Sequence, residues 1–390
     1  MRPLRVMLDA RMLIGRFSGV SRVVTKLVDA SVRRDDIQVV VLCASQAASP
    51  WAGRRDVETI TCDFDRKDRT PARRLWWEER RLPGIIRRAG VDVYHATWNT
   101  GVPALRRVPV VLSIHDLIPW HDPRSHFATC LQEWCYRLAM RASVRRATLV
   151  TAVSQHVRRQ VLTLFRVDPR RVVTVPNGVA PVERIEVQRA TAPYALYVGG
   201  HHPRKNVAAM FAAIQQYWDR FDDPLELWLT GCRTSLCQDA TEMYRRLKHP
   251  WRIRFLGDIA DDALARHYAS ATMLLMLSRD EGFGLPVLEA MAYGCPVIAA
   301  AAGSLPEVGG DAAILVAPDD ARETADAIRR LRVGPSDTAE LVRRGRNRAA
   351  AFSWDLTAER MTDLYLKAAL ESRAPRTTFS RVCSTAQVRS

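Results

Sequence analysis

Short apolar runs alternate with segments of helical spacing from one end of the 390-residue chain to the other. Apolar runs of about four to eight residues, bounded by polar or turn residues, predict buried strands. Such strands are expected at 4–10, 38–43, 91–96, 108–115, 148–153 and 172–175 in the first half, and at 194–198, 225–229, 253–256, 273–277, 297–300 and 313–316 in the second. Strands that alternate with helices form parallel sheets, so each half is expected to be a doubly wound α/β domain.

The stretch most typical of a linker is 177–193, which begins with Asn-Gly, ends with Pro and shows little periodicity. We therefore expect an N-terminal domain at 1–180, a second domain at 190–353, a final helix at 354–372 and a polar tail at 373–390. Two domains also suit a chain that is too long for one compact core. Because open parallel sheets bind ligands at the carboxyl ends of their strands, chemistry is expected in residues that directly follow strands.

Charge is distributed unevenly between the two halves. The net charge is +16, and residues 1–190 carry 33 Lys and Arg against 18 Asp and Glu, whereas residues 191–390 carry 25 against 24. Such asymmetry predicts a polyanionic surface or an acidic ligand for the first half alone. Membrane phospholipid, a lipid diphosphate and nucleic acid all fit this pattern.

No apolar run reaches the roughly 18 residues that span a bilayer, and the best, 272–277, has the length of a strand. Asp9 stands where the apolar region of a signal peptide would continue, so secretion is not expected.

The sequence offers weak metal-binding patterns. The C-x4-C pairs that begin at Cys130 and Cys232 fall in different expected domains, so we interpret the cysteines as reduced thiols. A D-x-D pattern at Asp63 and Asp65 could hold a metal ion, but it lies among charged residues of the basic half. We interpret it as a solvated loop and predict no metal.

The most specific segment is 280–297, DEGFGLPVLEAMAYGCPV, which follows an expected strand. Gly282 and Gly284 permit a tight turn and a close approach of the backbone to a ligand. The short helix that follows would point its N-terminus into the cleft, where backbone N–H groups bind a diphosphate. Glu281 lies ahead of this helix and Glu289 about one turn inside it, so both carboxylates can contact one ligand.

This segment resembles the E-x7-E signature of glycosyltransferase family 4 and related retaining enzymes. These have the GT-B fold, in which two Rossmann-like doubly wound domains face a central cleft. The resemblance implies that Glu281 contacts hydroxyls of the donor sugar and that Glu289 binds the ribose of the nucleotide. It also implies that the backbone amides of Phe283, Gly284 and Leu285 meet the diphosphate.

Residues 198–206, VGGHHPRKN, resemble the family's strand, loop and helix that carry a basic pair for the diphosphate. The resemblance implies that Gly200, Arg204 and Lys205 bind the donor. Two cations beside a helix start also stabilise a departing pyrophosphate, which makes Arg204 and Lys205 candidate catalytic residues. Many family members place an arginine where this chain has Gly200 and His201, and the sequence leaves open whether Arg204 replaces it.

In the first half, residues 9–22 resemble the family's first strand, glycine-rich loop and helix, which implies that Gly15 binds the donor. His115, in Ser-Ile-His-Asp-Leu, ends a strand as the family's H-D-L segment does. The resemblance places it near the reacting sugar, as a further candidate catalytic residue. His95 also ends a strand, and a functional or a structural role is open for it.

The resemblance implies transfer of a hexose with retention of configuration, and the sequence offers no obvious protein nucleophile. The departing diphosphate oxygen would itself help to remove the acceptor proton. The donor is expected to be a nucleotide-diphosphate sugar, with GDP-mannose favoured by likeness to mannosyltransferases, and no cofactor is expected. The expected acceptor is a saccharide or lipid-linked molecule, in the synthesis of cell-surface polysaccharide, lipopolysaccharide or another glycoconjugate. The last helix, 354–372, would cross back to the N-terminal domain.

Two other classes of function remain as alternatives. Another GT-B enzyme, an epimerase or a phosphorylase, would share the cleft signature. A basic nucleic-acid-binding protein fits a pI of about 10, but the basic half has no recognisable reader motif, so no nucleic-acid partner is expected.

The basic half is expected to attach the enzyme reversibly to the anionic inner face of the membrane, which makes it a cytoplasmic, peripheral protein. Residues 73–82, RRLWWEERRL, combine arginines and tryptophans at helical spacing. We expect one of these tryptophans in the core, and the role of the arginines stays open between solvated surface and membrane contact.

Overall fold

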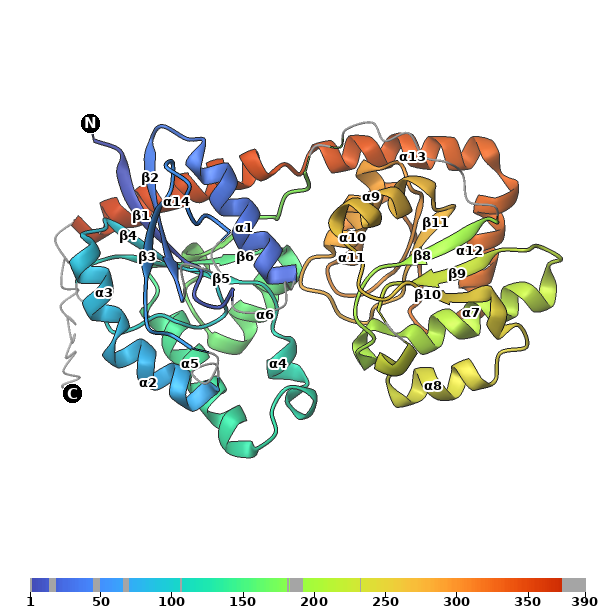
Figure 1. Ribbon diagram of the computed structural model, residues 1–390, viewed down its shortest axis with the longest axis horizontal. Coiled ribbons are helices and arrows are strands. Elements are labelled where there is room, and N and C mark those ends of the chain that lie inside the picture. The colour runs from blue at the N-terminus through green and yellow to red at the C-terminus, as the bar shows by residue number, and fades with distance from the viewer. Residues whose placement is uncertain are drawn as a thin grey trace, which may run out of the picture.

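The computed structural model describes residues 2–13, 19–44, 50–65, 70–105, 107–180, 182, 192–231 and 233–373. Within them the chain forms two α/β units that lie side by side (Figure 1). The first unit has the strand order β3-β2-β1-β4-β5-β6-β7 and the second β10-β9-β8-β11-β12-β13. Neighbouring strands are parallel in both sheets. This is the order of doubly wound, Rossmann-like domains, which confirms the expected fold class.

The elements of the first unit run in chain order from the N-terminus. They are β1 (Leu4–Asp9), α1 (Gly19–Val32), β2 (Ile37–Cys43), β3 (Glu58–Thr61), α2 (Pro71–Arg80), α3 (Leu82–Ala89), β4 (Val93–Ala96), β5 (Val110–Ile114), α4 (Ile118–His121), η3 (Pro123–Ser125), α5 (Cys130–Arg146), β6 (Leu149–Ala152), α6 (Gln155–Phe165), η4 (Pro169–Arg171) and β7 (Val172–Thr174).

The second unit follows, and the last helix returns to the first. Its elements are β8 (Tyr194–Tyr197), η5 (Pro203–Lys205), α7 (Val207–Arg220), β9 (Glu226–Leu229), η6 (Arg233–Ser235), α8 (Gln238–Arg245), η7 (Pro250–Arg252), β10 (Ile253–Phe255), α9 (Asp261–Ser270), β11 (Met273–Met276), α10 (Leu285–Ala292), β12 (Val297–Ala300), α11 (Leu305–Gly309), η8 (Gly310–Ala312), β13 (Ile314–Val316), α12 (Ala321–Val333), α13 (Pro335–Ala350) and α14 (Trp354–Arg373).

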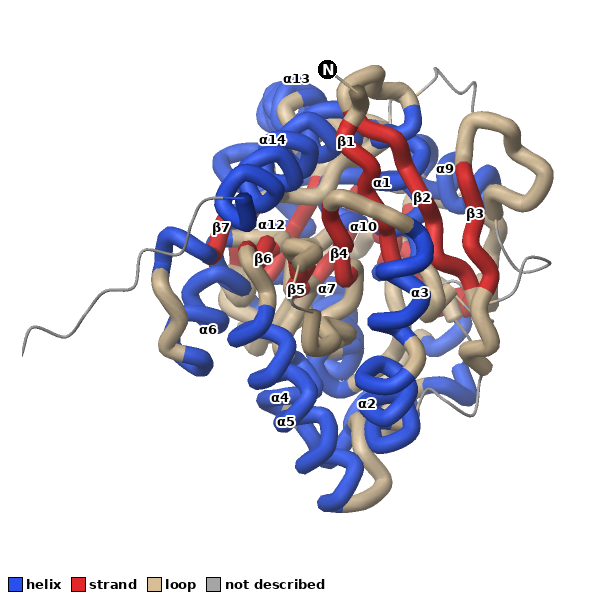
Figure 2. Tube along the Cα trace, turned by 90° about the vertical axis from the view of Figure 1, so that its left-hand side faces the viewer, coloured by secondary structure: helices blue, strands red, loops and turns tan. Residues whose placement is uncertain are grey.

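Helices cover both faces of the first sheet (Figure 2). Side chains alternate across a strand, so Val6 and Leu8 of β1 join the apolar cluster that includes α1 and α14. Met7, between them, joins the cluster on the other face, with Trp77 of α2 and Met140 of α5. Burial on both faces explains why the strands read as nearly continuous apolar runs.

The sheet of the first unit contains a strand that the apolar pattern does not predict. β3 has the sequence Glu-Thr-Ile-Thr, lies at the edge of the sheet, and pairs with β2. None of its residues is fully buried, because a strand at the edge of a sheet has a neighbouring strand on one side alone. Such a strand can be polar, so the apolar pattern of the sequence gives no signal for it.

α14 packs on α1 and on the first sheet, whereas α13, which precedes it in the chain, lies over the second unit (Figure 1). Its Tyr365 hydroxyl lies 2.7 Å from Nδ1 of His95, and Nε2 of His95 lies 2.8 Å from the Ser113 hydroxyl. Burial lowers the pKa of His95 to about 3. With both ring nitrogens bonded inside the protein, His95 is a structural residue that fastens α14 to the sheet.

Among the described residues, no helix is both long enough and apolar enough to cross a bilayer. The described cysteines, which leave out Cys232 and Cys383, form no disulfide with one another. In the D-x-D segment, Phe64 packs in the core against Trp77, and Asp63 accepts a hydrogen bond from the Trp77 indole at 3.2 Å. The segment thus serves the local fold, although the Asp63 side chain is exposed.

Candidate active site

Glu281 lies between β11 and α10, in the loop that leads into α10. Its side chain is buried, with Nζ of Lys205 2.5 Å from Oε1 and Nη1 of Arg204 3.2 Å from Oε2. Burial alone would raise the pKa of this carboxyl group. The two cations outweigh that effect and hold the pKa of Glu281 below its ordinary value. Glu281 is therefore an ionised carboxylate at neutral pH, and the structure brings it together with both predicted basic residues.

Arg204 and Lys205 lie on η5, the short helix that follows the loop after β8. Asn206 ends η5 in the left-handed region, with a φ of 57°, and its side-chain amide donates to the carbonyl oxygen of Pro318 at 2.8 Å. This hydrogen bond fixes the end of η5, from which Arg204 and Lys205 reach Glu281. Burial lowers the pKa of Lys205, and the Glu281 carboxylate opposes that shift.

The loop before η5 contains Gly200 and His201, which stand where many family members place an arginine. A Cβ on Gly200 would meet no atom within 4 Å, so space beside this residue is open to a ligand. His201, in contrast, is buried and used internally: Nε2 donates to the Thr230 carbonyl at 2.8 Å, and the Ser235 hydroxyl lies 2.7 Å from Nδ1. Arg204, on η5, lines a cavity of about 310 Å³ between the units.

His115 directly follows β5 of the first unit and lines the same cavity. Its Nε2 lies 2.7 Å from the Thr97 carbonyl oxygen, which can only accept, so Nε2 carries the proton. Burial lowers the pKa of His115, and the ring is therefore neutral with a lone pair on Nδ1. The carbonyl oxygen of His115 lies only 1.9 Å from where a Cβ of Gly282 would stand. Glycine is thus required at 282, because the loop of Glu281 touches the strand end of His115.

The loop that enters α10 is held by its carbonyl groups. The hydroxyl of Ser154, from the first unit, donates to the Gly282 carbonyl at 2.7 Å, and the hydroxyl of Ser304 donates to the Phe283 carbonyl at 2.7 Å. Gly284 caps α10 with a φ of 104°, a conformation that favours glycine. The first N–H groups of a helix lack partners within it, so this geometry presents the amides near Leu285 as an anion site.

Glu289 lies on α10 and lines a separate cavity of about 170 Å³. Its Oε1 accepts from Nη1 of Arg22 at 3.0 Å, and its Oε2 accepts from the Tyr268 hydroxyl at 2.9 Å. Arg22 belongs to α1 in the first unit and also pairs with Asp261 at 2.7 Å. The sequence itself predicts no role for Arg22 or Tyr268. Gly15, which the resemblance assigns to the donor, lies outside the described residues.

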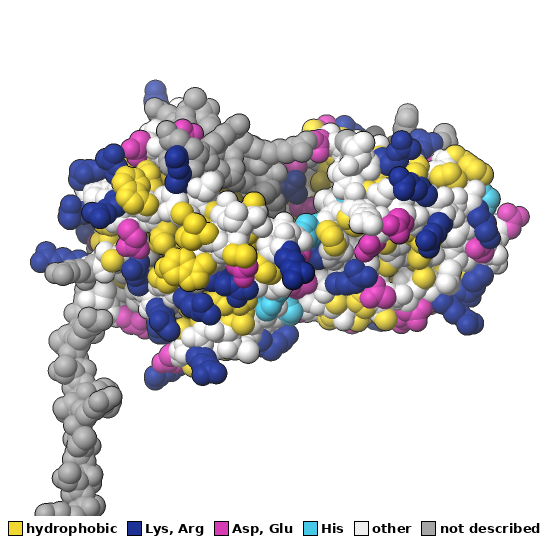
Figure 3. All heavy atoms as spheres, turned by 90° about the horizontal axis from the view of Figure 1, so that it is seen from below, with side chains coloured by type: hydrophobic (Ala, Val, Ile, Leu, Met, Phe, Trp, Pro, Cys, Tyr) yellow, Lys and Arg dark blue, Asp and Glu magenta, His cyan; other side chains and the backbone are white. Residues whose placement is uncertain are grey.

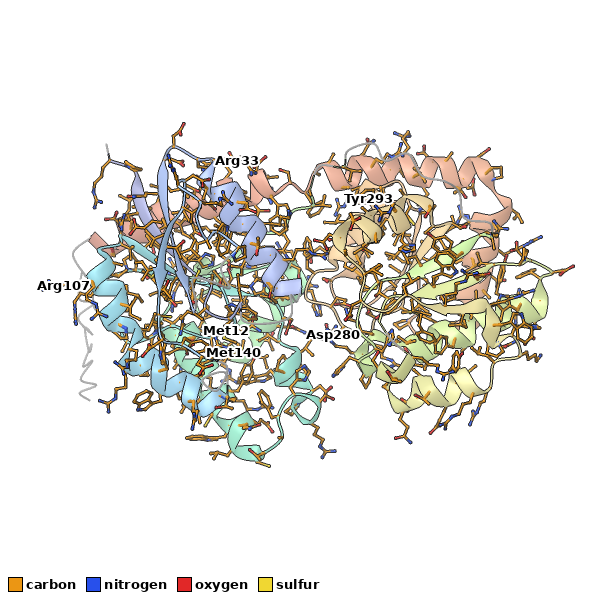
Figure 4. The ribbon with its side chains drawn as sticks, in the orientation of Figure 1. Met12, Arg33, Arg107, Met140, Asp280 and Tyr293 are labelled. Carbon is orange, nitrogen blue, oxygen red and sulfur yellow. The ribbon has the colours of Figure 1, made fainter. Side chains whose placement is uncertain are left out.

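Further hydrogen bonds join the first unit to the second. The backbone N–H groups of Gln155 and His156 donate to the Glu307 carboxylate at 2.8 and 3.2 Å. His156 Nε2 lies 3.1 Å from the Asp280 carboxylate, and Figure 4 shows Asp280 at the junction of the two units. A carboxylate at the N-terminus of α6 is favourable electrostatically, so these bonds hold the units together across the cleft.

Two family models match the chain. One, described as Glycosyltransferase Family 4, matches residues 17–183, and the other, described as Glycosyl transferases group 1, matches residues 192–332. The chain is similar to O-antigen chain mannosyltransferase B of Escherichia coli, with 31% identity over 256 residues. The match covers 63% of this chain and 67% of the relative.

Solved structures share the fold. Sucrose-phosphate synthase from Thermosynechococcus elongatus superposes with a TM-score of 0.75 at 20% identity, over 94% of this chain and 100% of that one. The Anabaena protein HepE, whose structure contains UDP and glucose, has a TM-score of 0.67 at 18% identity, over 93% of this chain and 100% of its own. At these identities the similarity establishes the fold alone.

Proposed function

The chain belongs to glycosyltransferase family 4 and transfers a hexosyl group from a nucleotide sugar, and on that premise we propose that the sugar is mannose and that its configuration is retained. We assign the donor to the cleft that holds Glu281, Lys205 and Glu289. The observation that carries this assignment is the buried Glu281 carboxylate, which is bonded to two cations beside the N-terminus of α10. Mannose is favoured because the Escherichia coli relative is named a mannosyltransferase.

The donor fits this cleft in one orientation. The nucleoside end occupies the cavity beside Glu289, where the carboxylate accepts hydrogen bonds from the ribose. The diphosphate lies at the start of α10 with Arg204 and Lys205, and the sugar hydroxyls reach Glu281. Nδ1 of His115, in the first unit, accepts a hydrogen bond from a sugar hydroxyl.

Catalysis in this arrangement is electrostatic. As the bond to the sugar breaks, negative charge grows on the diphosphate, and groups fixed in advance to meet that charge lower the barrier. Lys205 meets it by leaving Glu281, which then accepts from the sugar hydroxyls. The departing diphosphate oxygen takes the proton of the acceptor hydroxyl, which attacks from the same face, so the configuration is kept.

The cavity of about 310 Å³ next to His115 is our proposed acceptor site. Arg74 and Trp98 line it, and each has a buried donor without a hydrogen-bond partner, Nη2 of Arg74 and Nε1 of Trp98. Unpaired buried donors are unfavourable unless a ligand bonds to them. They suit an acceptor rich in oxygen atoms, such as a saccharide or the phosphate of a lipid carrier, used in the synthesis of cell-surface polysaccharide.

A thermal-shift panel of nucleotide sugars tests the donor assignment. GDP-mannose at about 100 times its Kd would stabilise the native state by about 2.7 kcal/mol and raise the Tm by a few degrees. UDP-glucose, tested at the same concentration, is expected to give a smaller shift. A larger shift with UDP-glucose than with GDP-mannose would contradict the mannose assignment and leave the transferase activity intact.

An apolar patch on the first unit supports peripheral attachment to a membrane. It consists of Trp76 on α2 and Leu131, Trp134 and Leu138 on α5, which are 59%, 64%, 61% and 43% exposed. Figure 3, seen from the side of α2 and α5, shows apolar side chains among many Lys and Arg side chains on this face. Trp77, next to Trp76 in the chain, is buried. One of the two tryptophans of residues 73–82 therefore belongs to the core, as expected. Apolar side chains ringed by cations suit the surface of an anionic bilayer.

Replacement of both patch tryptophans, in a Trp76→Ser/Trp134→Ser variant, is expected to weaken binding to anionic vesicles by about tenfold or more. Burial of a large apolar side chain contributes about 1.5–3 kcal/mol, which this variant loses. Flotation with anionic and neutral vesicles from 0.1 to about 1 M salt measures the binding, which is expected to fade as salt shortens the Debye length. Trp251→Ser, which removes a 70% exposed tryptophan from the second unit, is the matched control. Equal loss in the control, or equal binding to both vesicle types, would refute the patch as the attachment surface.

A further inference from the structure

Two histidines and an aspartate meet at the edge of the cleft, apart from the residues assigned to the donor. Asp122 and His126 flank η3 in the first unit, and His202 comes from the loop before η5 in the second. One possible ligand atom from each side chain lies within 4.8 Å of the other two. The rings of His126 and His202 have their centroids 5.3 Å apart.

The hydrogen bonds of this cluster leave suitable atoms for a metal ion. Nδ1 of His126 lies 2.8 Å from the carbonyl oxygen of Asp122, which can only accept, so Nδ1 carries the proton and Nε2 keeps its lone pair. A histidine that ligates a metal is commonly oriented by such a bond to a carbonyl group. Both ring nitrogens of His202 are shielded from solvent and have no hydrogen-bond partner. A buried polar atom without a partner is unfavourable, and a metal ion would satisfy one of them.

We propose that Asp122, His126 and His202 bind one divalent transition-metal ion of the zinc class, which joins the two units across the cleft. Two imidazoles and a carboxylate form a ligand set that Zn²⁺ accepts, with water in the fourth position. Ligand atoms about 2.0–2.2 Å from the metal lie roughly 3 to 4 Å from one another, so the side chains need to move by only about 1 Å.

The charges around the cluster allow a dication there. Arg204 and Lys205 follow closely after His202 in the chain, but both are bonded to the Glu281 carboxylate. Asp122 supplies the negative charge within the cluster itself. Because the ligands come from both units, the ion would stabilise the closed arrangement of the cleft, and it takes no part in breaking the sugar bond.

Isothermal titration of the full-length, chelator-treated protein with ZnCl₂ alone tests this proposal. The expected result is one ion per chain and an increase in Tm. His202→Ala and Asp122→Asn, one on each unit, are each expected to weaken zinc binding at least tenfold and to abolish the increase in Tm. His121→Ala removes an exposed neighbouring histidine and is expected to bind as the wild type does.

Titration with MgCl₂ is expected to give no binding at the same site, because imidazole ligands do not suit Mg²⁺. Zinc affinity within twofold of the wild type in both cluster variants would overturn the proposal, as would loss in the His121 control alone. Loss in Asp122→Asn but not in His202→Ala would also overturn it, because the site would then lie within one unit. No nucleotide sugar is present in these titrations, so their outcome is independent of the proposed function.

Discussion

Glu281→Gln is expected to lower kcat by about 10²–10³ while the protein keeps its wild-type Tm within a few degrees. The substitution preserves the shape of the side chain and removes the charge that holds Lys205 and Arg204 at 2.5 and 3.2 Å. Loss of one fixed group that acts on the transition state typically costs this factor. The sugar also loses a hydrogen bond to a charged acceptor, which is worth about 1.5–3 kcal/mol.

The same variant should bind the free nucleoside diphosphate as tightly as the wild type, or more tightly. In the structure the Glu281 carboxylate is bonded to the ammonium group of Lys205. A neutral amide at this position competes less strongly with the phosphate for that ammonium group. Steady-state kinetics and isothermal titration with GDP separate these two effects. Glu340→Gln, on the exposed surface of α13, is the matched control. Full turnover by the Glu281 variant would refute the assignment of the site.

Lys205→Met is expected to lower kcat by about 10² and to raise the KM for the donor by less than about tenfold. The methionine keeps most of the length of the side chain but lacks the ammonium group. Charge on the diphosphate increases as the sugar bond breaks, so the lost interaction is stronger in the transition state than in the bound donor. The side chain is largely buried, where a fixed charge acts more strongly than in water.

Steady-state kinetics over a range of donor concentrations measure the two parameters separately. Lys205→Arg restores the charge but not the compact geometry, so it is expected to recover only part of the turnover. A rise in KM alone would mean that Lys205 is an ordinary binding residue with no part in the departure of the diphosphate.

The sequence predicts the sheets well because parallel strands buried on both faces must be apolar along their length. β3 is not predicted, because its Glu-Thr-Ile-Thr sequence lies at an exposed edge of the sheet and is polar. His95, in contrast, lies in a buried strand, but the local sequence gives no signal for its role. Its role as a structural residue depends on Tyr365, which is 270 positions away and reaches it through α14.

In the candidate site, too, some residues have a local signal in the sequence and others do not. Glu281, Arg204 and Lys205 each follow a strand in the sequence, and the common edge of a parallel sheet brings them together. Contacts between the two units have no local pattern, so the pairing of Glu289 with Arg22 and the cluster around His202 emerge only from the fold.

The structure of the protein bound to its nucleotide sugar is the most direct measurement of where the donor lies. We predict that the diphosphate binds at the start of α10 and that Lys205 leaves Glu281 for a phosphate oxygen. Glu281 should then accept hydrogen bonds from the sugar, and Glu289 from the ribose. A diphosphate bound away from Lys205, with the ion pair between Lys205 and Glu281 intact, would contradict the account.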